Sequence, residues 1–206
     1  MPEKWKKIQR KDYKIIIDLI EKKSKVLDIG CSDGELLYQL KKTKNCKIQG
    51  IEINFDFIVE GVKKGIPIIQ HNIELGLPQI PDNFYDYVIL SQTLQVLLKP
   101  AEVLKEVLRI GKRAIISFPN FGHYQIRFYL LFKGLMPKSK VLPFEWYNTP
   151  NIHLITVKDF KKFCKEEKIK ILKEIYFSEE GIIHKKLANK MPNLFAEYGI
   201  YLLEKR

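Results

Sequence analysis

The chain has 206 residues, of which 46% are hydrophobic and 29% are charged, and this composition is typical of a folded globular protein. The length suffices for one α/β domain and is too short for two of full size, so we expect a single domain over residues 1–206. No run of about 18 apolar residues is present, and the N-terminus lacks the apolar core of a signal peptide. The sequence therefore predicts a cytoplasmic protein without a membrane partner.

The formal net charge of +12 comes from 36 basic and 24 acidic residues. Such a balance is found in nucleic-acid-binding proteins, but here the basic residues are spread along the chain and 31 of them are lysine. Because arginine is favoured for bidentate recognition of bases and phosphates, we expect no nucleic-acid partner. Cys31, Cys46 and Cys164 form no C-x-x-C pair, and no set of residues has metal-ligand spacing, so neither disulfides nor a metal site is predicted.

Helix and strand patterns alternate over the first 118 residues. The periodicity predicts helices over residues 11–20, 35–42, 55–64 and 100–110, and strands over residues 25–29, 47–53, 66–70, 86–90 and 114–118. Short connections between alternating elements favour a parallel sheet built from right-handed crossovers. The fold class is therefore α/β, with helices flanking the sheet.

The C-terminal part has a different pattern. Thr156 and Asp159 form a near capping box, which predicts another helix. Two strands over residues 169–177 and 198–204 follow, with no clear helix between them, and this favours an antiparallel pair at the sheet edge. We expect a seven-stranded, mostly parallel sheet with strand order 3-2-1-4-5-7-6.

An aromatic-rich insertion over residues 118–150 follows the fifth strand. It holds nine of the 24 aromatic residues, and the stretch Ile126–Phe132 is apolar nearly all round. An all-round apolar helix is expected to be buried on more than one side. The insertion is expected either to complete the core, to cover the open end of the sheet, or to contact a partner through Phe128, Phe132, Trp146 and Tyr147, beside Lys133, Lys138 and Lys140.

The strongest chemical motif is the segment VLDIGCSDGELL, in which a strand runs into a glycine turn and a helix follows. Gly30 and Gly34 allow the backbone to approach a ligand closely, at the end of the sheet where α/β proteins bind ligands. Glu52 lies 22 residues after Gly30, at the end of the second strand, where a carboxylate can accept both hydroxyls of a ribose. The pattern predicts a nucleoside-containing ligand, and we expect Glu52→Ala to weaken its binding without altering the fold.

The spacing decides between two ligand classes. A dinucleotide site of the G-x-G-x-x-G type needs a third glycine, which is absent. Asp28, just before the turn, is an awkward neighbour for a pyrophosphate but a suitable acceptor for an ammonium group. The spacing resembles motif I of class I methyltransferases, which favours S-adenosylmethionine or S-adenosylhomocysteine as cofactor over a nicotinamide.

This resemblance implies the remaining cofactor contacts. Asn72 is expected near the adenine amino group, Ile73 against the adenine ring, and Ser91 near the sulfonium. The predicted cofactor-binding residues are Asp28, Gly30, Cys31, Ser32, Gly34, Glu52, Ile53, Asn72, Ile73 and Ser91.

A narrower resemblance covers about residues 25–170. It is carried by VLDIGCSDGELL and GIEI and by three more specific segments, YDYVILSQTLQ, ISFPNFGHY and LPFEWYNTPNIHL, which together are similar to the methionine biosynthesis protein MetW family. The resemblance implies a class I methyltransferase fold, a Rossmann-like arrangement, and a role beside a homoserine O-acyltransferase. The chain departs from the family pattern at Ser32, usually glycine, and at Asn72, usually aspartate.

Whether the protein is an enzyme stays open from sequence. Methyl transfer needs in-line positioning and, for some acceptors, a base. Among the four histidines, His123 is the best candidate for this catalytic role because it follows the fifth strand. Two hypotheses remain: a cofactor-binding partner that supports the acyltransferase, and a methyltransferase acting on a small molecule. Self-association is compatible with both.

Overall fold

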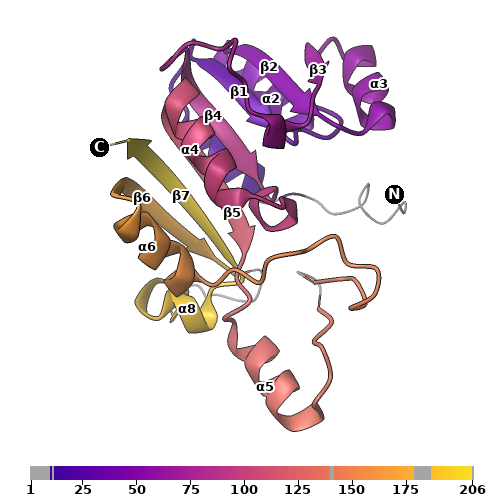
Figure 1. Cartoon of the computed structure of the whole chain (residues 1–206), viewed down its shortest axis with the longest axis vertical. Helices are drawn as coiled ribbons and strands as arrows, with labels where there is room; N and C mark the ends of the chain where they lie inside the picture. Colours follow the sequence, from indigo (N-terminus) through magenta and orange to yellow (C-terminus); the bar gives the residue numbers. More distant parts are fainter. Residues whose placement is uncertain (1–9, 11, 140–141, 179–186, 206) are drawn as a thin grey trace.

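A seven-stranded sheet forms the centre of the computed structural model, which describes residues 10, 12–139, 142–178 and 187–205. The strand order is β3-β2-β1-β4-β5-β7-β6, as predicted (Figure 1). The strands are β1 (Lys25–Ile29), β2 (Lys47–Glu52), β3 (Ile68–Gln70), β4 (Tyr85–Ser91), β5 (Gly111–Pro119), β6 (Ile169–Phe177) and β7 (Tyr198–Lys205).

The pairing of the strands is also as expected. β1 to β5 are parallel to one another, whereas β7 runs antiparallel to both β5 and β6. The predicted ends differ mainly at β3, which begins at Ile68 rather than residue 66, and at β5, which begins at Gly111 directly after its helix. A short helix, α8 (Pro192–Phe195), precedes β7 where no clear helix was predicted.

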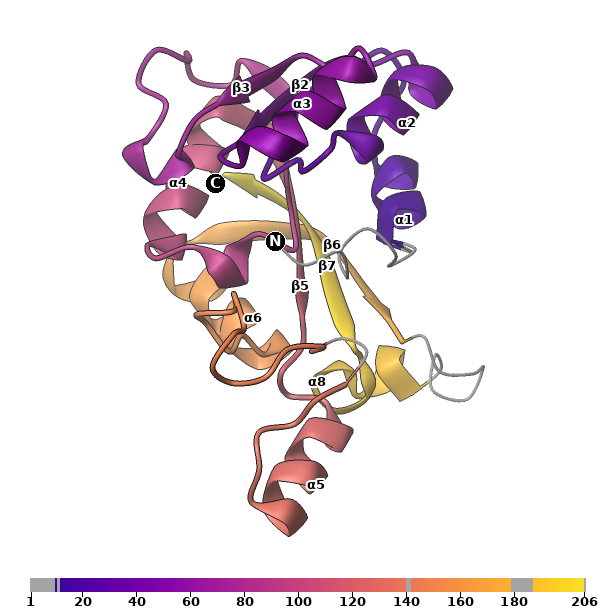
Figure 2. The same ribbon diagram turned by 90° about the vertical axis from the view of Figure 1, so that its right-hand side faces the viewer.

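Helices cover both faces of the sheet. The long helices are α1 (Asp12–Leu19), α2 (Glu35–Lys44), α3 (Phe55–Lys63), α4 (Pro100–Ile110), α5 (Tyr124–Lys133) and α6 (Val157–Glu166), with short 3-10 turns η2 (Ile73–Leu75) and η3 (Leu94–Val96). One apolar cluster joins the sheet to α1 and α2, and a second joins its other face to α4 and α6. Figure 2 shows α1 and α2 on the side of the sheet opposite α4 and α6.

The sequence of β4 shows why both faces are buried. Tyr87 and Ile89 belong to the cluster with α1 and α2, whereas Val88 and Leu90 belong to the cluster with α4 and α6. Successive side chains of a strand point to opposite faces, so a continuous apolar run is stable only where both faces are covered.

Helix α5 differs from the sequence-based expectation. The stretch Ile126–Phe132 was expected to be buried on more than one side, but α5 contains no buried residue. Phe132 is 75% exposed and Leu131 is 72% exposed. The helix stands away from the sheet and its covering helices (Figures 1 and 2). The expectation of burial is wrong for this chain alone, because no element of the described structure covers the apolar side chains of α5.

Some expectations fall on residues 1–9, 11, 140–141, 179–186 and 206, which lie outside the described residues. They include the expectation for Lys140, and His184, one of the four histidines, also lies there. Among the described residues, no helix is long and apolar enough to cross a membrane.

Candidate functional site

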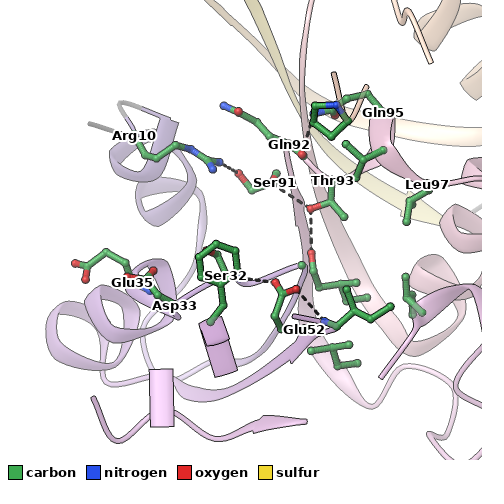
Figure 3. A pocket seen from close by; sticks show the side chains of 18 of the residues that line it. Arg10, Ser32, Asp33, Glu35, Glu52, Ser91, Gln92, Thr93, Gln95 and Leu97 are labelled. Carbon is green, nitrogen blue, oxygen red and sulfur yellow. Dashed lines mark hydrogen bonds between the residues drawn. The ribbon is translucent and has the colours of Figure 1, made fainter. Parts of the chain in front are cut away.

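A cavity of about 990 Å³ lies at the carboxyl ends of β1, β2 and β4. This volume is at the upper end of the range typical for small-molecule and cofactor sites. Figure 3 shows the side chains of 18 of the residues that line it. Seven of the residues that the sequence predicted for the cofactor line this cavity: Gly30, Ser32, Glu52, Ile53, Asn72, Ile73 and Ser91.

The glycine turn after β1 brings two loops into close contact. Gly30 has a φ of +72°, and a Cβ atom at this position would lie 2.6 Å from Oγ1 of Thr93. The Thr93 hydroxyl in turn donates to the carbonyl of Ile29 at 3.2 Å. Only glycine combines this left-handed conformation with such a close approach, so the turn and the loop after β4 form one continuous wall of the cavity.

Glu52 lies at the end of β2, and backbone groups hold its carboxylate. Oε2 accepts from the N–H of Ser32 at 2.9 Å, and Oε1 accepts from the N–H groups of Ile53 and Asn54 at 2.8 and 3.0 Å. An ionised carboxylate has about four acceptor positions, so about one remains for a ligand hydroxyl. The carboxylate is therefore fixed at the cavity wall and retains capacity to accept a hydrogen bond.

Asp28 is buried beneath the turn and is not one of the residues that line the cavity. Burial raises the pKa of its carboxyl to about 8, with Glu52 and Asp12 acting in the same direction and Arg10 opposing them. No described residue pairs with its Oδ1 atom. At neutral pH the group is thus largely protonated, because desolvation penalises the charged form.

Cys31 and Gly34 also lie behind the cavity wall and do not line it. Cys31 is buried, and burial raises the pKa of its thiol. Gly34 has a φ of +72° and is the N-cap residue of α2. Cys31 and Gly34 are therefore part of the turn but do not face the cavity.

Asn72 and Ile73 line the cavity after β3. The Oδ1 atom of Asn72 accepts from the backbone N–H of Glu74 at 3.0 Å and so caps the turn η2. Ile73 is a buried apolar side chain at the cavity. This part of the cavity thus combines an amide with an apolar side chain.

Ser91 belongs to a polar cluster that the sequence did not predict. Its hydroxyl accepts from Nη2 of Arg10 at 2.6 Å and donates to Oδ2 of Asp12 at 3.0 Å. Arg10 and Asp12 are near the start of α1, about 80 positions earlier in the chain, and Arg10 also lines the cavity. A contact across such a separation leaves no local signal in the sequence.

His123 lies elsewhere. It is 3% exposed, precedes α5 and packs against the ring of Tyr124, and it is not among the residues that line the cavity. The nearby Asn120 is structural, because its amide donates to the carbonyl of Ala196 at 2.7 Å and its Oδ1 accepts from Gly122 N–H at 3.0 Å. His71 lines the cavity instead, with Nε2 2.9 Å from the carbonyl of Gly76. Within the described part of the chain, no group of three His, Cys, Asp or Glu side chains could hold a metal ion.

Solved structures identify the fold class of the chain. An S-adenosylmethionine-dependent methyltransferase from Archaeoglobus fulgidus matches with a TM-score of 0.66 at 19% identity, over 93% of this chain and 90% of that one. The plantazolicin methyltransferase BpumL in complex with SAH matches with a TM-score of 0.62 at 18% identity, over 89% of this chain and 76% of that one. The chain has the class I methyltransferase fold, a Rossmann-like arrangement.

Sequence comparison identifies the family within that class. The family model described as methionine biosynthesis protein MetW matches residues 10–203, and the chain belongs to this family. The bifunctional methionine biosynthesis protein MetXA/MetW of Rhodopirellula baltica is 34% identical over 175 residues, which cover 81% of this chain. The match spans only 28% of that relative, so the chain corresponds to a minor part of its length.

Proposed function

We propose that the cavity binds S-adenosylmethionine or S-adenosylhomocysteine, and that the protein supports a homoserine O-acyltransferase in methionine biosynthesis. The observation that carries the first part is the Glu52 carboxylate, held by three backbone N–H groups beside the glycine turn. A ribose needs such an acceptor, and the apolar wall at Ile73 offers a surface for adenine. The bound SAH in the plantazolicin methyltransferase supports this choice by analogy of fold.

Isothermal titration calorimetry with S-adenosylhomocysteine tests the ligand. We expect saturable one-to-one binding by the purified protein and no competition from NAD⁺, since the turn lacks the third glycine of a dinucleotide site. Equal competition by NAD⁺ would instead support the nicotinamide alternative.

The partner is proposed from two observations. The relative from Rhodopirellula baltica joins MetXA and MetW in one chain, and physical linkage of two proteins suits proteins that act together. Helix α5 and the following loop expose Phe128, Phe132, Trp146 and Tyr147. Aromatic side chains contribute much of the binding energy at many protein interfaces. We therefore propose this exposed aromatic surface as the contact with the acyltransferase.

Co-elution on size exclusion tests this contact. Phe132→Ser and Trp146→Ser should abolish co-elution with a homoserine O-acyltransferase and leave the melting temperature nearly unchanged, because both side chains are already exposed. Phe55→Ser is the matched control, since Phe55 is 63% exposed on α3, at the other end of the molecule (Figure 1). Retained co-elution in both α5-side variants would contradict the proposed contact.

A methyltransferase acting on a small molecule is the second candidate. Besides Ser91, the residues that line the cavity include Gln95, Phe144 and Asn151. A methyl acceptor needs a binding surface next to the sulfonium, and we propose these residues for it. His123 does not line the cavity, so α5 would have to move before His123 could act as the base of this methyltransferase. His71, in contrast, already lines the cavity. Release of S-adenosylhomocysteine on adding candidate acceptors would favour this candidate over the supporting role.

A further inference from the structure

We propose that the cavity holds two ligands side by side, and that the second is an uncharged small molecule with an apolar body. Its place, the uncharged half of the cavity, is lined by the residues from Gln92 onward: the loop after β4, the end of β5, the loop before α6 and the start of β7. This assignment rests on the proposed function, because we place the adenosyl ligand against Glu52 in the other half. It adds the chemical class of the second ligand.

Charged side chains line only one half of the cavity. Among the described residues, all seven acidic, lysine and arginine side chains that line it come from residues 10–74. The lining residues from Gln92 onward have amide, hydroxyl, aliphatic, aromatic or proline side chains, and none of these is charged. They include Gln92, Gln95, Pro119, Phe144, Asn151 and Tyr198. Figure 3 shows Gln92, Gln95 and Leu97 on one side of the cavity and Asp33 and Glu35 on the other.

This distribution of charge selects the ligand. A charged group bound in the uncharged half would lose its water without gaining an opposite charge, which is costly. An apolar body gains contacts with proline and aromatic side chains there. The side-chain amides both donate and accept, so they can orient a hydroxyl or amide group of the ligand. The cavity volume of about 990 Å³ is at the upper end for one drug-sized ligand, which leaves space beside the adenosyl compound.

The fold holds the walls of the uncharged half in place. The carbonyl of Gln95 accepts from the N–H groups of Ile152 and His153 at 2.8 and 3.0 Å, and these bonds attach the loop before α6 to η3. Pro119 and Tyr198 are partners in the antiparallel pairing of β5 and β7. Two walls of the site are therefore formed before a ligand binds, which reduces the entropy lost on binding.

The backbone of Gln92 gives an independent argument. Gln92 has a φ of +53°, a left-handed conformation that is unfavourable for a residue with a side chain. Its N–H donates to the carbonyl of Ser117 at 2.9 Å and lies 3.2 Å from the Ser117 hydroxyl, and these contacts hold the conformation. Backbone strain of this kind gathers at ligand sites, where it orients a side chain. The strained residue here is an amide on the wall of the uncharged half.

Three probes of similar shape test the ligand class. At neutral pH benzamide is uncharged, benzoate is an anion and benzylammonium is a cation. Each is titrated into the protein saturated with S-adenosylhomocysteine, and binding is followed by chemical-shift changes in NMR. We expect benzamide to bind with a Kd of about one millimolar, as is typical of so small a ligand. Benzoate and benzylammonium should bind at least roughly tenfold more weakly.

Phe144→Ser tests the apolar wall. It should weaken benzamide binding by roughly tenfold, because part of the apolar contact is lost, and leave the affinity for S-adenosylhomocysteine within about twofold of wild type. Trp146→Ser is the matched control. Trp146 lies two positions further along the same loop, is 72% exposed and does not line the cavity, so this variant should bind both ligands as wild type does.

Asn151→Asp tests the absence of charge. The backbone N–H of Asn151 donates to Oγ1 of Thr149 at 3.2 Å, and the substitution keeps this contact, so the variant should fold. It places a carboxylate in the uncharged half and should strengthen benzylammonium binding by roughly five- to tenfold. Unchanged benzylammonium affinity would show that this probe does not reach the uncharged half.

The outcomes separate this assignment from the proposed function. The uncharged half is not a site for neutral ligands if a charged probe binds as tightly as benzamide, if benzamide displaces S-adenosylhomocysteine, or if a protein saturated with that compound binds no probe. If S-adenosylhomocysteine itself does not bind, the proposed ligand is wrong. Titration of the ligand-free protein then decides the assignment alone: selective benzamide binding supports it, and unselective or absent binding overturns it.

Discussion

The Oε2 atom of Glu52 accepts a hydrogen bond from the backbone N–H of Ser32 at 2.9 Å, and this contact joins the end of β2 to the glycine turn after β1. The other carboxylate oxygen binds the N–H groups of Ile53 and Asn54. Such support fixes the carboxylate before a ligand arrives. It also revises the expectation that Glu52→Ala spares the fold, because alanine would leave three backbone donors without their acceptor.

Ser32 has a φ of +51°, a conformation that costs a non-glycine residue roughly 1–2 kcal/mol. Ser32→Gly should therefore stabilise the protein by up to about 1 kcal/mol, after the greater flexibility of unfolded glycine is deducted. Thermal unfolding should show a rise of about 2–4 °C in Tm. Lys41→Gly, inside helix α2, is the control and should lower Tm. A drop in Tm for Ser32→Gly would mean that the serine side chain has a stabilising role of its own.

Asn72→Asp should increase the affinity for S-adenosylhomocysteine. The single amide oxygen of Asn72 is engaged by the N–H of Glu74, whereas aspartate can cap this turn and offer its second oxygen to the adenine amino group. One added hydrogen bond predicts a roughly two- to tenfold gain in calorimetry. Asn45→Asp, at the C-cap of α2 outside the cavity, should have no effect. Weaker binding by Asn72→Asp would place the adenine elsewhere.

Asp28 should make stability depend on pH. Burial raises its pKa from 3.8 to about 8, so the folded state binds a proton that the unfolded state has released in this range. The stability contributed by the protonated carboxyl is complete below pH 3.8 and is lost as the pH rises toward 8. Relative to Asp28→Asn, the wild-type protein should lose up to roughly 1.4 kcal/mol per pH unit within that window.

Urea unfolding at pH 5, 6, 7 and 8 measures this difference. The exposed Asp18 provides the control, because Asp18→Asn should leave the pH dependence of wild type unchanged. Parallel curves for wild type and Asp28→Asn would show that the Asp28 carboxyl ionises normally in the folded protein.

Local patterns in the sequence were sufficient to predict the sheet and one side of the cavity. Gly30 and Glu52 are recognisable because a turn and a strand end have fixed places in a parallel sheet, and the nearly continuous apolar run of β4 predicts its burial on both faces. The helix N-cap at Thr156 is present as predicted, with its hydroxyl accepting from Asp159 N–H. These features depend on neighbours within a few residues.

The features that were missed depend on distant contacts. Arg10 reaches Ser91 across 81 positions, and no periodicity near residue 10 indicates this contact. The apolar sequence of α5 gives its hydrophobicity but does not show that the helix stands away from the sheet. Asn120 directly follows β5, a position where a catalytic residue could lie. Its side-chain amide instead donates to the carbonyl of Ala196 and so connects the end of β5 to the segment before β7.

The affinity of Glu52→Gln for S-adenosylhomocysteine tests the central claim most directly. The amide keeps the size of the side chain but loses its charge and one acceptor, so the variant should fold and its calorimetric affinity should fall by about 1–3 kcal/mol relative to wild type. Glu35→Gln, at the rim of the cavity, should bind as wild type does. The account is contradicted if the wild-type protein shows no heat of binding, or if a folded Glu52→Gln variant binds the ligand as tightly as wild type.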